Sequence, residues 1–120
     1  MAKFMLILHN APGVLRNLSP EEMQQKIEKY QSWINKIRSS GRYVSSEKLG
    51  EEGGKLLSRQ GGRVNVVDGP YSETKEVVGG YFVLRAANYE EAIELTRDCP
   101  FLEDGRIELR QTDPMGCGGE

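Results

Sequence analysis

Residues 67–81 read VDGPYSETKEVVGGY, and the rest of the chain is organised around them. Asp-Gly-Pro at residues 68–70 is a turn-forming cluster, and the glycine pair at residues 79–80 opens a second apolar run. This polar loop therefore joins two expected strands, residues 63–67 and 78–85. Binding and catalytic residues concentrate on loops that a rigid scaffold holds in place, so we expect a functional site beside this loop.

The composition is that of one ordinary globular domain. The chain has 120 residues, of which 38% are hydrophobic and 28% charged, so it is long enough for one core and too short for two. A net charge of −2 gives no electrostatic reason to expect binding to nucleic acid. We expect one domain at residues 1–112, a flexible tail at residues 113–120 and no nucleic-acid partner.

Cysteine spacing and hydropathy bear on cofactors and location. Cys99 and Cys117 have no zinc-binding spacing and the chain has a single histidine, so we expect no metal site and no cofactor. The apolar run from Phe4 to Leu8 is too short for a signal peptide or a membrane span. We therefore expect a cytoplasmic protein with free thiols and no membrane contact.

The apolar run at residues 4–9 is expected to form the first strand. It ends at the breakers of residues 10–13, and its continuous apolar character predicts a strand buried on both faces. Side chains alternate along a strand, so His9 should point to the same side as Met5 and Ile7.

A long amphipathic helix is predicted over residues 20–40. Ser19 can cap its first turn, Glu22 stands at the capping-box position, and Gly41 can end the helix. Apolar residues recur at spacings of three and four and form one stripe, with Trp33 beside it: Met23, Ile27, Tyr30, Ile34 and Ile37.

The remaining chain predicts further strands and one more helix. The strands are expected at residues 42–49, 55–58, 63–67, 79–86 and 106–110, with a glycine turn at residues 60–62 making a hairpin. A second helix begins at the cap Asn88 and ends before Pro100, with Glu91 at the capping-box position. Its inner face should consist of Ala92, Ile93 and Thr96.

This order of elements predicts an α+β, ferredoxin-like split βαβ fold, with an antiparallel sheet and both helices on one face. The strands at residues 4–9 and 79–86 are apolar on both faces, and the helices can cover only one. An apolar patch on the order of several hundred Å² is unusual on a monomer. We therefore expect a homodimer that pairs sheet to sheet.

Residues 66–84, VVDGPYSETKEVVGGYFVL, closely resemble the signature of the YCII-related proteins, in the branch named for its DGPF motif. SPEE at residues 19–22 and FLEDGRIELRQ at residues 101–111 extend the likeness over nearly the whole chain. The resemblance implies a ferredoxin-like fold that pairs as a dimeric α/β barrel, with a cleft beside the central loop. Most members of this branch have no established reaction, and some similar domains accompany sigma-factor-type transcription regulators.

More distant YCII relatives include dehydrochlorinase-type enzymes, for which a histidine–aspartate acid/base pair has been proposed. That histidine belongs to the first helix, and residues 20–40 contain none, so the pair does not carry over. Tyr71 also stands where the motif name has phenylalanine.

Two residues are candidates for acid/base catalysis. Asp68 stands at a strand end, where partial burial could raise its pKa, although an aspartate before glycine also often caps its own turn. His9 can titrate near neutral pH, or it can be a satisfied histidine at the end of a strand.

The central loop supplies candidates for ligand binding: Ser72, Glu73, Thr74 and Lys75. Lys75 could bind an anionic group as a point charge. The alternative is a solvated loop face whose charges pair weakly with one another.

Three functions fit these patterns. The first is a small-molecule-binding protein with acid/base chemistry, an elimination or an isomerisation, in a cleft between the central loop and the first strand. The second is a non-catalytic regulatory or interaction module that serves a transcription regulator. The third is a stress- or antibiotic-related binding protein that sequesters its ligand. An enzyme requires a concave pocket, whereas an interaction module requires a conspicuous exposed patch.

Overall fold

A computed structural model of the protein describes residues 1–10, 18–50, 54–69 and 77–114. In chain order the elements are β1 (Ala2–Asn10), α1 (Pro20–Ser39), β2 (Tyr43–Lys48), β3 (Lys55–Gln60), β4 (Arg63–Asp68), β5 (Val77–Ala86), α2 (Tyr89–Thr96), the 3-10 helix η1 (Pro100–Glu103) and β6 (Gly105–Gln111). This is the predicted order, with η1 as an addition. Most of the predicted tail lies outside the described residues.

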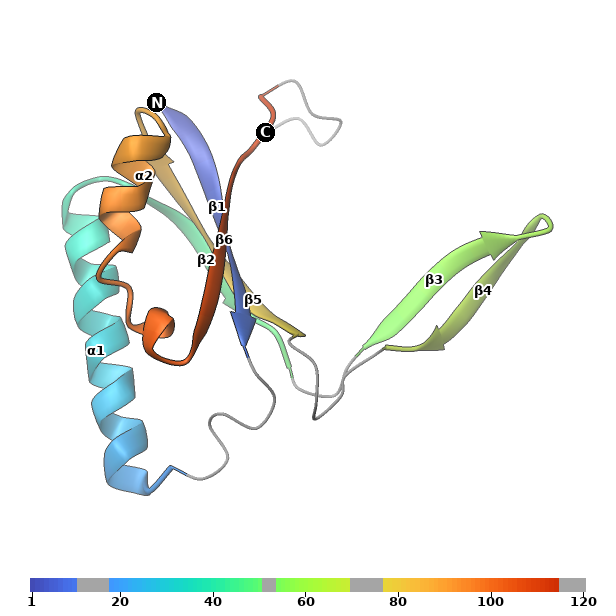
Figure 1. Ribbon diagram of the computed structural model, residues 1–120, viewed down its shortest axis with the longest axis horizontal. Coiled ribbons are helices and arrows are strands. Elements are labelled where there is room, and N and C mark those ends of the chain that lie inside the picture. Colours follow the sequence, from blue (N-terminus) through green and yellow to red (C-terminus); the bar gives the residue numbers. More distant parts are fainter. Residues whose placement is uncertain (11–17, 51–53, 70–76, 115–120) are drawn as a thin grey trace.

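Four strands form one antiparallel sheet in the order β2-β5-β1-β6, and α1 and α2 both lie on one side of it (Figure 1). The two central strands are in register, with Phe4 opposite Leu84 and Ile7 opposite Tyr81. The predicted α+β ferredoxin-like arrangement is confirmed.

Local sequence signals set the ends of α1. The Ser19 side chain accepts a hydrogen bond from the Glu22 backbone N–H at 3.1 Å, and the Glu22 carboxylate accepts one from the Ser19 N–H at 3.0 Å. At the other end Gly41 takes a positive φ of 76°, a conformation that glycine adopts without the steric cost that other residues meet. The predicted capping box and the glycine stop are both confirmed.

In α2 only half of the predicted capping box forms. Asn88 Oδ1 accepts from the Glu91 N–H at 2.9 Å, as expected of a cap. The Glu91 carboxylate, however, accepts from the Ala87 N–H and pairs with the Arg42 guanidinium, which lowers the pKa of Glu91. Glu91 therefore ties the helix start to the residue before β2.

The core lies between the sheet and the helices. Trp33 and Ile37 from α1 pack with the buried side chains of the central strands, which include Leu6, Leu8, Phe82 and Leu84. The Trp33 and Phe82 rings meet edge to face at 5.1 Å.

Two predicted inward positions are wrong. Ile93 is 41% exposed because α2 turns Ala92 and Thr96 towards the sheet, and a helix rotates about 100° per residue. Ile27 is 42% exposed because it lies beside a hollow.

No described residue covers the sheet side away from the helices, which we call the open face. Its centre is apolar and its edge is charged: Met5, Ile7, His9, Tyr81, Val83, Arg106, Glu108 and Arg110. In the single chain β1 buries only Phe4, Leu6 and Leu8, and Met5 and Ile7 are half-buried. The prediction of a strand buried on both faces is therefore wrong for the chain alone, because nothing in the described part of the chain covers the second face.

β3 and β4 form the predicted hairpin, here called the arm (Lys55–Asp68). Its turn uses Gly61 and Gly62 at φ of 55° and 82°. The arm leaves one end of the sheet and projects away from the helices (Figure 1), and every residue of its two strands is exposed. The Cα radius of gyration is consequently 16.6 Å, against about 14 Å for a compact domain of this length. No helix among the described residues is long and apolar enough to cross a bilayer.

Candidate functional site

Two hollows lie on different sides of α1. The smaller one, here called the cleft, has a volume of about 390 Å³ and lies between α1, the ends of β1 and β2, and the start of β5. Its walls are largely apolar and include Leu8, Met23, Ile27, Ile34, Phe82 and Phe101. Apolar walls around a few polar groups are typical of small-molecule sites.

The glycine pair that opens β5 shapes one wall of the cleft. Leu8 pairs with Gly80 and His9 with Val78, so Gly79 is the extra residue of a β-bulge. A Cβ on Gly79 would lie 2.1 Å from Asn10 Oδ1, and one on Gly80 would lie 2.6 Å from the Glu47 backbone oxygen. The close approach of the β2 backbone therefore requires glycine at residue 80, whereas at residue 79 it is the Asn10 side chain that occupies the space of a Cβ.

An ion pair brings charge to the cleft lining. Lys26 Nζ donates to Asp104 Oδ2 at 2.6 Å, and the two side chains are only 19% and 16% exposed. Tyr30 also lines the cleft, and burial, with the nearby acidic groups, raises its pKa. The Tyr30 phenol therefore stays neutral and can donate a hydrogen bond, and it forms none with another described residue.

One fully buried polar atom among the described cleft residues has no hydrogen-bond partner. Asn10 Oδ1 is buried against Gly79 and accepts no hydrogen bond from any described group. A buried amide oxygen without a partner costs about 1–3 kcal/mol, which natural folds keep only at few positions. Asn10 therefore marks a strained point of the cleft wall.

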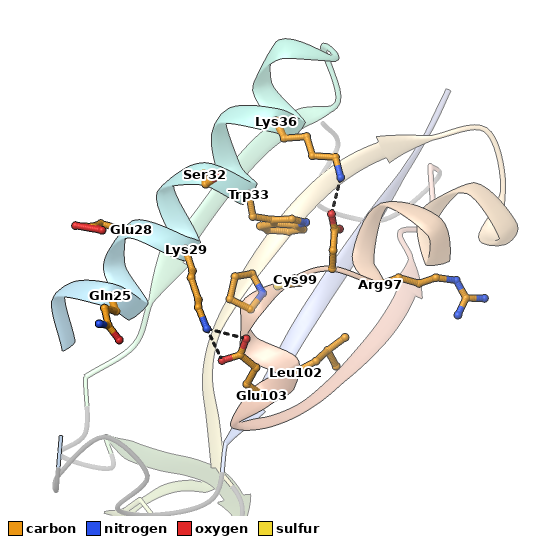
Figure 2. Close-up of a pocket in the computed structure, with 12 residues that line it drawn as sticks. Gln25, Glu28, Lys29, Ser32, Trp33, Lys36, Arg97, Cys99, Leu102 and Glu103 are labelled. Carbon is orange, nitrogen blue, oxygen red and sulfur yellow. Dashed lines mark hydrogen bonds and ion pairs between the residues drawn. The ribbon is translucent and has the colours of Figure 1, made fainter. Parts of the chain in front are cut away.

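The larger hollow, here called the groove, is an open depression of about 770 Å³ between α1 and the segment from Arg97 to Glu103 (Figure 2). Its two lysines pair with carboxylates that also line it: Lys29 with Glu103 at 3.3 Å and Lys36 with Asp98 at 2.5 Å. The hydrogen bond from Lys36 lowers the pKa of Asp98.

Two uncharged side chains of the groove are also engaged or buried. Trp33 Nε1 donates to the Leu95 backbone oxygen at 3.1 Å, and Cys99 is buried, which raises the pKa of its thiol to about 11. A thiol held neutral is a poor nucleophile. In the groove, although it is the larger hollow, both lysines are therefore paired, the indole N–H is used and the thiol is buried.

The predicted acid/base residues do not meet. Asp68 ends β4 with its side chain 86% exposed, and Oδ1 accepts from Lys55 Nζ at 2.5 Å across the arm. His9 lies on the open face, where its Nε2 is 2.9 Å from Glu108 Oε1. Asp68 and His9 share no hydrogen bond, and neither lines the cleft among the described residues.

The predicted ligand-binding residues Ser72, Glu73, Thr74 and Lys75 lie outside the described residues. The cleft does lie next to residues that directly follow the loop in the sequence. Val77 and Val78 line the cleft, together with Leu49.

Sequence reasoning missed the residues that carry charge into the cleft. Lys26 and Asp104 are 78 positions apart, so no local pattern could pair them. Tyr30 was visible as part of the apolar stripe of α1, but a stripe does not distinguish core from cleft lining. No group of three or more histidine, cysteine, aspartate or glutamate side chains suited to a metal ion occurs among the described residues.

The sequence model of the YCII-related domain matches residues 2–115. The chain belongs to the YCII-related family. Within a stretch of 64 residues it is 33% identical to an uncharacterized protein of Rhizobium meliloti (strain 1021), which covers 48% of this chain and 52% of that protein. The chain thus matches about half the length of this curated relative.

A solved structure with a similar fold is that of the 5-chloro-2-hydroxyhydroquinone dehydrochlorinase from Burkholderia phenoliruptrix, in complex with 2,5-dihydroxybenzoquinone. The TM-score is 0.56 at 10% sequence identity, with 98% of this chain and 99% of that chain covered. At this identity the likeness establishes a shared fold.

Proposed function

We propose that this YCII-related protein binds a small amphipathic molecule in the cleft between α1 and the start of β5. The observation that carries the proposal is a cavity of about 390 Å³ with apolar walls and a partly buried ion pair. Ligand pockets span roughly 300–1,000 Å³ and combine apolar walls with a few well-placed polar groups.

The polar groups of the cleft favour a ring-sized ligand that carries hydroxyl or carboxyl groups. Lys26 can donate to an anionic oxygen, and the neutral Tyr30 phenol can donate to a carbonyl or phenolate. The same set suits proton-transfer chemistry such as an elimination or an isomerisation. In that case Asp104 accepts a proton and Tyr30 stabilises the developing oxyanion.

A thermal-shift screen of small carboxylates, phenols and hydroxyquinones tests the proposal. A hit should raise the melting temperature of the native protein in a concentration-dependent way. The shift should be lost in Lys26→Met and kept in Lys36→Met, a matched change in the groove. Hits that survive Lys26→Met, or an absence of hits at millimolar concentration, would contradict binding in the cleft.

The site residues predicted from the sequence remain part of the proposal, but with other partners than the sequence suggested. His9 can act as an acid/base group with Glu108 as its partner, since the 2.9 Å contact orients the imidazole. Asp68, on the arm, and the loop residues Ser72, Glu73, Thr74 and Lys75 remain candidates for ligand binding, which single substitutions in the thermal-shift assay would test. We also propose that two copies pair with their open faces towards each other, so that each copy covers the open face of the other, because nothing in the described part of one chain covers the half-buried Met5 and Ile7.

A non-catalytic interaction module is the second candidate function. The exposed apolar side chains of the arm favour it: Leu56, Leu57, Val64, Val66 and Val67, each between 47% and 66% exposed. If the arm alone carries the function, arm variants should abolish it and Lys26→Met should leave it intact. Deletion of the gene, complemented by each variant, separates the two.

A further inference from the structure

The arm has few stabilising contacts within one chain. It is a two-stranded sheet of its own, β3 pairs only with β4, and all residues of both strands are exposed. An isolated two-stranded hairpin is marginally stable at best in water, and its unpaired edges invite another chain. Something outside the described part of this chain must therefore cover the arm.

Both sides of the arm carry apolar side chains. Leu56 stands opposite Val67 on one side, and Leu57 stands opposite Val66 on the other. Side chains directly opposite on neighbouring strands share a face, so each side holds an apolar cross-strand pair. A hairpin that packed only on the surface of its own domain would need one apolar side. Two such sides indicate an element that is enclosed by a larger assembly.

We propose that the arm docks on the open face of a second copy of this chain, in a two-fold pair in which each copy clasps the other. The inference rests on the proposed pairing of two copies and specifies how they pair. The arm leaves the sheet towards the side without helices, so that the arm and the open face form two sides of an angle (Figure 1). A second copy of the same shape can enter this angle.

A second copy is favoured over a foreign partner because one symmetry operation covers both unpartnered surfaces. In a two-fold pair each arm meets the partner's open face, so neither the arm nor Met5 and Ile7 remain bare. A foreign protein on the arm would leave the open face uncovered. The arm and the open face together supply about two dozen residues per copy, which matches the roughly 20–30 residues a side of a standard stable interface.

The pairing also encloses the His9–Glu108 contact. Glu108 is 44% exposed in the single chain, and the docked arm of the second copy would cover it. The acid/base pair would then lie in a space bounded by two chains and be screened from bulk water.

Sedimentation velocity on the full chain tests the proposal, with three variants. The first carries Leu57→Asp and Val66→Asp. The second replaces the arm by three glycines between Gly54 and Gly69, whose backbone atoms already form a 2.7 Å hydrogen bond. The third, Ile7→Lys, alters the open face. We expect a dimeric native protein and a weakening of the dimer by about 100-fold or more in every variant.

Leu102→Asp serves as the matched control, because Leu102 is 45% exposed but lies in the groove. It should leave the dimer intact. Circular dichroism establishes that each variant is folded. The arm deletion removes no core residue, so the deletion variant remains informative where a point variant unfolds. A dimer that survives arm deletion would overturn arm docking and leave pairing itself in place.

Two other outcomes would overturn the inference. If the arm variants are monomeric but Ile7→Lys is dimeric, the arm docks on something other than the open face. If the native protein is a monomer at millimolar concentration, both the arm docking and the pairing of two copies are wrong. Neither result bears on ligand binding in the cleft, which the thermal-shift screen tests separately.

Discussion

The cleft and the groove flank the same helix, yet they differ in how their polar groups are used. The groove has about twice the volume of the cleft, but its lysines are paired with surface carboxylates, as in Lys36–Asp98 with 65% and 51% exposure. The cleft holds one ion pair, Lys26–Asp104, that is largely shielded from water. The ligand site is identified less by its volume than by polar groups that are shielded from water and still able to bond a ligand.

The largest expected effect concerns the floor of the groove. Trp33 is 3% exposed and packs on Phe82, so we expect Trp33→Ala to lower the free energy of unfolding by about 3–5 kcal/mol. Urea denaturation measures this, with Ser32→Ala on the exposed rim as the control that changes little. A loss below about 1 kcal/mol would mean that the floor is not part of the core.

The next effect concerns the wall of the cleft. A Cβ at residue 79 would clash with Asn10 Oδ1, so Gly79→Ala should destabilise the fold by about 2–3 kcal/mol and weaken ligand binding. Adding Asn10→Ala removes the clashing oxygen and should restore most of the stability. If the double variant is no more stable than Gly79→Ala alone, the close contact is not the cause.

The two ion pairs provide the most direct contrast. Lys26→Met leaves Asp104 shielded without its partner and should cost about 1–2 kcal/mol of stability. Lys36→Met breaks a solvent-exposed pair and should stay within about 0.5 kcal/mol of the native protein. Equal effects of the two changes, measured by chemical denaturation at moderate salt, would remove the distinction between the hollows.

The smallest effect is a dependence on alkaline pH. Burial raises the pKa of Cys99 from 9.0 to about 11, so its contribution to stability is complete below pH 9 and is lost as the pH rises towards 11. We expect a loss of about 1 kcal/mol between pH 8 and pH 10 from this group. Cys99→Ala should flatten that slope, and an unchanged slope would show that the thiol is not the group that titrates.

The sequence predicted most of the fold because its signals are local. The capping box at Ser19, the glycine that ends α1 and the glycine turn of the arm each act within a few positions, and each forms as expected. Both helices on one face followed from the order of elements. The burial of Ile93 was misjudged because residue type alone does not tell which face of a short helix turns inward.

The candidate site was less predictable because its contacts are long-range. His9 contacts Glu108 rather than Asp68 because β1 and β6 are neighbours in the sheet. No local motif specifies the register of these two strands. Lys55 forms an ion pair with Asp68 across the predicted hairpin, and only the structure shows that the Asp68 carboxylate stays exposed there. The cleft itself depends on how α1 lies against the sheet, and only the tertiary structure brings Lys26 and Asp104 together.

Backbone NMR of the native protein during titration with a thermal-shift hit tests the central claim most directly. The account predicts chemical-shift changes concentrated at the cleft residues Ile27, Leu49 and Val78, and little change at Lys29, Arg97 and Leu102 of the groove. Changes concentrated at the groove residues, with the cleft amides unmoved, would contradict it.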